Sequence, residues 1–227
     1  MNKKIILELN DIHKTYYTAG VALEVLKGAN FKVSEKQTVA IVGESGSGKS
    51  TFLHIASLLD NFDDGRIIFK RRQIQGLCDK KKSKIRNKNF GFVYQSHLLM
   101  KEFTVLENVL MPKLIEHSIK KKDKEKALDL LAKLNISELA DKFPIELSGG
   151  QQQRVAIARA LIQSPKVVFA DEPTGNLDPE TAKVVREVFN QIIQEEGSSL
   201  VIVTHDMALA KTCDKIYKLE NKVLLEV

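Results

Sequence analysis

The hydrophobic pattern of this chain alternates between short apolar runs and longer stretches that carry an apolar stripe on one side. The short runs have the length and composition of buried strands, and they lie at residues 37–43, 90–95, 166–170 and 199–204. Between the first two, residues 49–60 show helical spacing, with apolar positions at Phe52, Leu53, Ile55, Ala56 and Leu59. Strands that alternate with helices in this way predict an α/β fold with a mostly parallel sheet covered by helices.

A further helix is predicted at residues 180–197, where Gly197 supplies a stop signal. Its apolar positions are Val184, Val185, Val188, Phe189, Ile192 and Ile193. Residues 96–154, by contrast, contain only helical patterns. We therefore expect one domain, with a core at about 1–95 and 155–227 and an inserted helical subdomain at about 96–154. The last residues predict a hairpin that turns near Asn221.

The composition is that of a globular protein large enough to bury a core, with 227 residues of which 43% are hydrophobic. No apolar run approaches the roughly 18 residues that a membrane span needs. The apolar run near the start is interrupted by Glu8 and Asp11, which is unlike a signal peptide. Cys78 and Cys213 lack metal-ligand spacing and are typical of reduced cytosolic cysteines. These features predict a cytoplasmic chain, unless a partner recruits it to a membrane.

The net charge of +6 is unevenly distributed, because lysines and arginines cluster at 70–72, 79–88 and 120–126. Such clusters could contact nucleic acid or an anionic membrane surface. They lack interleaved aromatic residues, so stacking on single-stranded bases is not expected. A solvated, lysine-rich face is the simplest interpretation, and we predict no nucleic-acid partner.

The sequence "GESGSGKS" matches the phosphate-binding loop pattern G-x-x-x-x-G-K-[ST], and it follows a predicted strand and opens a predicted helix. Its glycines allow backbone N–H groups to turn inward toward a phosphate chain, and the helix N-terminus adds the positive end of its dipole. Lys49 is expected to reach the β- and γ-phosphates, and the Ser50 hydroxyl to bind Mg²⁺. The predicted nucleotide-binding residues here are Gly43, Glu44, Ser45, Gly46, Ser47, Gly48, Lys49, Ser50 and Thr51.

Two adjacent acids end the predicted strand in "VVFADEP". An aspartate at such a strand end holds Mg²⁺ in phosphate-binding-loop proteins, which predicts this role for Asp171. Glu172 points the other way along the pleat and is placed to orient or deprotonate the water that attacks the γ-phosphate. Kinases, helicases and GTPases share both motifs, so together they predict nucleotide binding and not a particular activity.

Five further motifs resemble those of ATP-binding cassette (ABC) ATPases, and they occur in the order of that family over essentially the whole chain. "LSGGQQQR" at 147–154 resembles the family signature, and "VYQ" resembles the Q-loop, ending at Gln95. "PTGNLD" resembles the D-loop, ending at Asp178, and "VTHD" offers His205 as the switch histidine. "KTYY" offers Tyr16, or Tyr17, as the aromatic residue that stacks on adenine.

The resemblance implies a fold and a set of roles. The fold would be that of a P-loop NTPase with a RecA-like core and an antiparallel N-terminal portion. Gln95 would sense Mg²⁺ and the γ-phosphate, and His205 would hydrogen-bond that phosphate. Asp178 would lie at a subunit contact. The remaining implied residues would bind the γ-phosphate held by the other protomer of a head-to-tail homodimer: Ser148, Gly149 and Gly150.

Within the family, residues 90–115 and 146–178 are most similar to the LolD-type lipoprotein-releasing ATPases, in a group that also holds the MacB and FtsE ATPases. The resemblance implies an ATP- and Mg²⁺-dependent ATPase at the cytoplasmic face of the inner membrane, below separate LolC/LolE-like membrane subunits. FtsE-type signalling in cell division and MacB-like export with a separate permease are the alternatives. A cassette acting on DNA or ribosomes would need coiled-coil arms or a second cassette.

The chain departs from the LolD pattern at three places. Lys101 stands where proline is usual, next to the segment expected to meet the membrane partner. Lys70-Arg71 replaces Asn-Gly, which should strain a tight type I′ turn or lengthen it. Asn221-Lys222 similarly replaces Asp-Gly.

Overall fold

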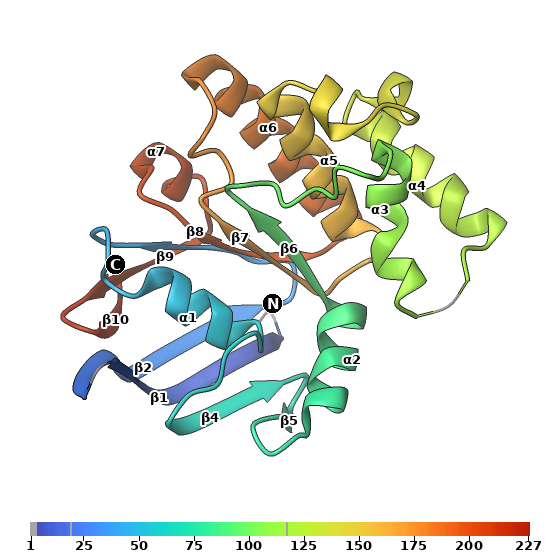
Figure 1. The fold of residues 1–227 in the computed structure, drawn as a ribbon. Coiled ribbons are helices and arrows are strands. Elements are labelled where there is room, and N and C mark those ends of the chain that lie inside the picture. The colour runs from blue at the N-terminus through green and yellow to red at the C-terminus, as the bar shows by residue number, and fades with distance from the viewer. Residues whose placement is uncertain (1–3, 19, 117) are drawn as a thin grey trace. The chain divides into compact units, whose positions relative to one another are not determined.

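The computed structural model describes residues 4–18, 20–116 and 118–227 (Figure 1). The chain forms two compact units. The first contains the residues up to Arg86 together with Ser199–Val227, and the second contains Asn87–Ser198. No helix in these described stretches has both the length and the hydropathy needed to cross a membrane.

The first unit contains an antiparallel sheet of β1 (Ile5–Thr18), β2 (Val21–Ser34), β4 (Asp64–Phe69) and β5 (Arg72–Gln73), in the order β2-β1-β4-β5. Leu7 and Leu9 of β1 lie opposite Val33 and Phe31 of β2, and all four side chains are buried. The alternation of these residues with polar ones gives the sheet one buried face. The antiparallel N-terminal portion that the family resemblance implied is therefore confirmed.

The same unit contains a second set of strands in which β3 (Thr38–Val42) is central. It runs parallel to β8 (Ser199–Val203) and to β9 (Lys215–Glu220), and β10 (Val223–Glu226) pairs antiparallel with β9. Every residue of β3 and β8 is buried, as their mostly apolar sequences predicted. The closing hairpin near Asn221 is also confirmed.

The helix after the phosphate-binding loop is shorter than predicted. α1 spans Lys49–Ala56, and the chain turns at Leu58, which has a left-handed φ of 63°. Leu59 was expected in the buried stripe but its side chain is 45% exposed, because the helix has already ended. The prediction was correct for Phe52 and Ile55, which are completely buried.

The Lys70-Arg71 turn between β4 and β5 keeps the tight two-residue form. Both residues have positive φ values, 50° and 63°, in the region that glycine and asparagine adopt at least cost. Asn221 and Lys222, between β9 and β10, have φ values of 49° and 69°. The turns are thus strained and not lengthened.

The second unit packs helices around a parallel pair of strands, β6 (Phe90–Tyr94) and β7 (Val167–Asp171). Its helices are α3 (Val105–Leu114), α4 (Lys121–Lys133), α5 (Gly149–Leu161) and α6 (Pro179–Glu196), with 3₁₀ turns at Ser137–Leu139 and Pro144–Glu146. α5 contacts β6, α3, α4 and α6, and it therefore forms the centre of the unit (Figure 1). The boundaries 96 and 154 of the helical subdomain stay a prediction.

Two helices differ from the expectation. In α6, Val185, Phe189 and Ile193 are buried, but Val184 is 44% exposed because it lies at the edge of the apolar stripe. The side chains of Val188 and Ile192 lie outside the described part of the structure. The second difference is α2 (Asp79–Asn89), a helix in the charged run 79–88, which has no apolar periodicity and was not predicted to be helical.

Candidate nucleotide-binding site

The phosphate-binding loop leaves the buried strand β3 and enters α1 in the first unit. Glycine is required at two of its positions by close approach. A Cβ on Gly43 would lie 2.6 Å from the Leu219 carbonyl oxygen, and a Cβ on Gly48 would lie 2.5 Å from Val25 Cγ1. Gly48 also has a left-handed φ of 102°. The loop is thus held against β2 and β9 by contacts that no side chain could accommodate.

The loop presents hydrogen-bond donors that fit a chain of phosphates. Lys49 is buried, and its Nζ donates to the carbonyls of Gly43 and Glu44 at 2.9 Å and 2.7 Å. An ammonium group has three N–H donors, so one remains. Ser47 Oγ is buried without a partner among the described residues, and Gly48 at the N-cap offers no side chain to the first N–H groups of α1. Ser50 lies exposed in that first turn, and Thr51 is partly buried.

The predicted switch histidine follows β8 at the same edge of the sheet. Ile41 of β3 pairs with Val203 of β8, and the Thr204 amide donates to the Ile41 carbonyl at 3.1 Å. His205 itself is exposed. Because β3 and β8 are parallel neighbours, the phosphate-binding loop and His205 leave their carboxyl ends together.

Asp206 fixes the segment after the histidine. Its carboxylate caps α7 (Met207–Ala210) by accepting the amides of Ala208 and Leu209 at 2.8 Å and 3.2 Å. Its own amide donates to Thr204 Oγ1 at 3.0 Å. The chain on both sides of His205 is thereby held by hydrogen bonds.

Of the two tyrosines in "KTYY", the structure builds Tyr16 into a polar cluster. Its hydroxyl donates to Asp60 Oδ2 at 2.7 Å, and Lys14 Nζ lies 4.6 Å from the centre of its ring. Burial and the Asp60 carboxylate raise the pKa of Tyr16, and a hydrogen bond with Thr51 of α1 opposes them. Tyr17 is 78% exposed. Tyr16 therefore lies at the start of α1, whereas Tyr17 points to solvent.

The acidic strand end and the Q-loop come together in the second unit. Tyr94 of β6 pairs with Asp171 of β7, so Gln95 and Glu172 follow at the same sheet edge. Glu172 has a left-handed φ of 45°, an uncommon conformation of the kind that concentrates at functional sites. A Cβ on Gly175 would lie 2.8 Å from Gln95 Nε2 and 3.5 Å from Glu172 Cβ. Gly175 therefore allows this approach.

Asn176 completes that arrangement, and sequence reasoning gave it no role. Gln95 Nε2 donates to Asn176 Oδ1 at 2.9 Å, and Asn176 Nδ2 donates back to the Gln95 carbonyl at 3.2 Å. This reciprocal pair fixes the amide of Gln95 beside Glu172. The only sequence signal was the asparagine inside "PTGNLD".

The signature segment begins α5 as an ordinary, well-formed helix start. Ser148 is the N-cap: its Oγ accepts the Gln151 amide at 3.3 Å, and Gln151 Oε1 accepts the Ser148 amide at 2.8 Å. Gly149 leaves room for Leu177 Cδ2, 3.4 Å from where its Cβ would be. A Cβ on Gly150 would clash with Thr181 Cγ2. Gly150 is thus needed for α5 to approach α6, in addition to any contact with phosphate.

The predicted subunit-contact residue caps the neighbouring helix. Asp178 Oδ1 accepts the Thr181 amide at 3.1 Å at the start of α6. Hydrogen bonds from the Thr181 hydroxyl and amide lower the pKa of the Asp178 carboxyl. The signature and the D-loop therefore lie side by side through Gly150 and Thr181.

A second residue that sequence reasoning missed links the signature helix to the Q-loop. Arg159 of α5 donates to the carbonyls of His97 and Leu98 at 2.6 Å and 2.5 Å. Both carbonyl residues have left-handed φ values, 58° and 49°, directly after Gln95 and Ser96. Burial lowers the pKa of Arg159 and, together with the Arg159 charge, that of His97. The guanidinium thus holds a strained turn in place.

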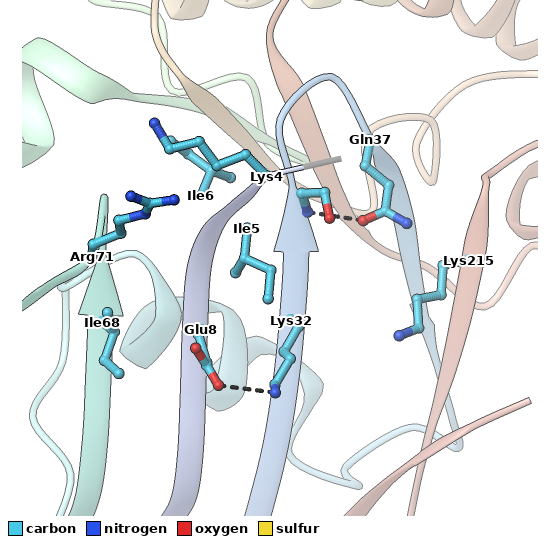
Figure 2. Close-up of a pocket in the computed structure, with 10 residues that line it drawn as sticks. Lys4, Ile5, Ile6, Glu8, Lys32, Gln37, Ile68, Arg71 and Lys215 are labelled. Atoms are coloured by element: carbon cyan, nitrogen blue, oxygen red, sulfur yellow. Dashed lines mark hydrogen bonds and ion pairs between the residues drawn. The ribbon is translucent and has the colours of Figure 1, made fainter. Parts of the chain in front are cut away.

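The first unit also contains a hollow of about 940 Å³ that involves none of these motifs (Figure 2). It lies against β1, β2 and β4, and Glu8 Oε1 pairs with Lys32 Nζ at 3.0 Å between two adjacent strands that line it. Gln37 accepts the Ser34 amide at 2.8 Å at its margin. This hollow is separate from the phosphate-binding loop.

Comparison with known proteins identifies the class to which this arrangement belongs. Residues 26–175 match the family model described as ABC transporter. The dimeric structure of the ABC transporter cassette MJ0796 matches with a TM-score of 0.88 and 35% identity, covering 96% of each chain. A post-hydrolysis dimer of MJ0796 bound to ADP and phosphate matches with a TM-score of 0.87. The chain therefore belongs to the ABC transporter family and is the ATP-hydrolysing subunit of an ABC transporter.

Among curated relatives, the chain is similar to lipoprotein-releasing system ATP-binding proteins named LolD. It is 44% identical to the one from Treponema denticola over 227 residues, the full length of both chains. It is 45% identical to that of Hyphomonas neptunium, covering 97% of each chain. The predicted family, fold class and ATPase activity are confirmed, whereas the individual site residues stay predictions.

Proposed function

We propose that this chain powers the release of lipoproteins from the inner membrane, as a homodimer below two LolC/LolE-like membrane subunits at the cytoplasmic face. The observation that supports this most directly is its similarity to LolD proteins, which extends over the whole length of both chains. The dimeric state of a structural relative supports the homodimer.

The proposed roles follow from the chemistry of each residue. The phosphate-binding loop, with Lys49, holds the phosphates of ATP, and Tyr16 stacks on the adenine. Ser50, Asp171 and Gln95 would supply oxygen ligands for Mg²⁺, and the bound ion would neutralise charge on the phosphates. Ser148, Gly149 and Gly150 of one protomer contact the γ-phosphate held by the other, and Asp178 lies at the subunit contact.

Hydrolysis transfers the γ-phosphoryl group to water. Glu172 accepts a proton as the water oxygen bonds to phosphorus, and the bond from phosphorus to the bridging oxygen breaks to leave ADP. His205 hydrogen-bonds the γ-phosphate during this step. Loss of that phosphate removes a contact between protomers, so they separate. In a monomer, no second chain supplies signature residues to the bound γ-phosphate, so the monomer should hydrolyse ATP poorly.

The base assignment is tested with Glu172→Gln, which keeps the shape of the side chain but cannot accept the proton. A general base contributes about 10²–10⁴-fold, so ATP hydrolysis should fall by at least about 100-fold while ATP binding persists. Size-exclusion chromatography with ATP and Mg²⁺ should then show a persistent dimer. Glu195→Gln, at an exposed position of α6, is the control. Hydrolysis at the normal rate in Glu172→Gln would refute the assignment.

The transport role needs its own experiment. Affinity purification of the tagged full chain from membranes should recover membrane subunits of the LolC/LolE type, and depletion should mislocalise lipoproteins. Recovery of a cell-division membrane protein alone, with filamentous cells on depletion, would favour FtsE-type signalling and contradict lipoprotein release.

A further inference from the structure

The helix α2 carries an unusual concentration of positive charge. Its sequence, DKKKSKIRNKN, contains six lysines and arginines and a single acid, Asp79. None of its described residues is buried. A helix that is polar on all sides is normally stabilised by pairs of opposite charge, and α2 has a single acid of its own.

The charges are sorted onto two sides of the helix. Successive residues are rotated by about 100°, so four lysines fall within one arc of about 100°. We call this arc the lysine face: Lys80, Lys81, Lys84 and Lys88. All four side chains are exposed. Asp79 lies outside the arc.

The opposite side attaches the helix to the protein. Arg86 Nη1 donates to the Leu58 carbonyl at 2.7 Å, and Lys82 Nζ donates to Asn61 Oδ1 at 3.0 Å. Lys82 and Arg86 are partly buried, as is Ile85 between them. The orientation of α2 is therefore fixed, and the lysine face points to solvent.

Most of the lysine face has no counter-charge among the residues that the structure describes. Lys88 pairs with Glu116 at 2.7 Å, but Lys80, Lys81 and Lys84 form no ion pair with any residue that the structure describes. Lys80 and Lys84 are four residues apart and repel each other. Lys80 and Lys81 also lie in the first turn, where the helix dipole disfavours cations. These charges on the lysine face therefore disfavour the helical conformation of α2.

The other lysine-rich helix, α4, shows the usual solution. Its five lysines share the helix with three acids: Lys121 pairs with Glu125 at 3.9 Å, and Lys133 pairs with Asp129 at 3.2 Å. Lys121, Lys122 and Lys124 are as exposed as the lysine face of α2. The contrast indicates that the missing negative charge of α2 comes from outside the chain.

We propose that the lysine face of α2 binds the anionic phospholipid surface of a membrane. Its compact, hydrated ammonium groups suit attraction to a diffuse layer of charged headgroups. Arginine forks and stacked aromatic residues, which read nucleic acids, are missing from the lysine face. It also has no apolar residue to anchor a protein partner. The contact is electrostatic and lies outside the ATPase chemistry proposed above.

The experiment measures sedimentation of the full chain with vesicles of phosphatidylcholine alone or mixed with phosphatidylglycerol. Binding should require phosphatidylglycerol and weaken as salt is raised. Each lysine near an anionic surface contributes about fivefold, so the triple change Lys80→Gln, Lys81→Gln and Lys84→Gln should weaken partitioning about 100-fold. ATPase activity of this variant should equal that of the unchanged protein. A loss of vesicle binding can therefore be distinguished from a loss of the ATPase function proposed above.

The matched control removes three exposed lysines from α4 by Lys121→Gln, Lys122→Gln and Lys124→Gln, which changes the net charge equally. It should keep most of the binding. Equal losses in the two variants would mean that only net charge matters, and would overturn the proposal. Unchanged vesicle binding of the α2 variant would also overturn the proposal. So would a result in which duplex DNA displaces the protein from the vesicles and binds the protein only when the lysine face is intact.

Discussion

Asn108 holds the part of the segment after the Q-loop that runs from Met100 to Thr104. Its side chain is completely buried in α3. Oδ1 accepts the Met100 amide at 2.8 Å, and Nδ2 lies 3.0 Å from the Met100 carbonyl, 3.0 Å from that of Phe103 and 2.9 Å from that of Thr104. One amide group thus closes the loop that runs from residue 100 to 104 onto the start of α3.

The cost of removing it can be calculated from these contacts. Nδ2 has two hydrogens, so its three carbonyl contacts share two N–H groups, and Oδ1 adds one acceptor. Three buried hydrogen bonds at about 1 kcal/mol each give a loss of about 3 kcal/mol for Asn108→Ala. In a chain of this size, that corresponds to a melting temperature lower by about 6–12 °C.

Thermal unfolding tests the global effect, and hydrogen exchange of the Met100 amide tests the local one, because this amide loses its acceptor. Asn108→Asp should be at least as unstable as the alanine variant, since a carboxylate would face three carbonyls without a proton to donate. Asn30→Ala is the control, because Asn30 makes two hydrogen bonds at an exposed position. If Asn108→Ala lowers the melting temperature no more than Asn30→Ala, the reasoning is refuted.

Two other predictions concern the first unit. The double change Lys70→Asn and Arg71→Gly should stabilise the protein by about 1–2 kcal/mol in urea unfolding, because both residues have positive φ; a loss of stability would contradict the strain. Burial raises the pKa of Cys213 to about 11. At pH 8 only about one Cys213 thiol in a thousand is ionised, so iodoacetamide should modify exposed Cys78 first, and Cys213 labelling should rise about tenfold per pH unit. Equal labelling of both cysteines at pH 8 would be evidence against this pKa.

The local structure around the phosphate-binding loop was predicted correctly from the sequence, because it depends on residues that are neighbours along the chain. The phosphate-binding loop needs a buried strand, a glycine-rich turn and a helix start, and all three are consecutive in the chain. Strands β6 and β7 were predicted to within one residue at each end for the same reason, since each is a short apolar run of strand length. Once two such strands are parallel neighbours, their following residues Gln95 and Glu172 must share an edge.

Helix α2 could not be found in this way. Hydrophobic periodicity detects a helix by the face that it buries, and α2 buries none of its described residues. The predicted burial of Leu59 and Val184 was wrong for a related reason. Each residue lies in a periodic apolar stripe, but the position of the helix end or of the neighbouring element decides which residues of the stripe are covered.

The sequence by itself determined the class of this protein and the succession of strand, glycine-rich loop and helix that we propose binds phosphate, because each is encoded by neighbours along the chain. The tertiary structure alone decided what Asn108, Asn176 and Arg159 do. Their partners are carbonyls, amides and side chains of loops. Because every residue has the same backbone carbonyl, the sequence does not indicate which carbonyl will accept a hydrogen bond. Which polar side chain closes which turn depends on distances that exist only after the chain has folded.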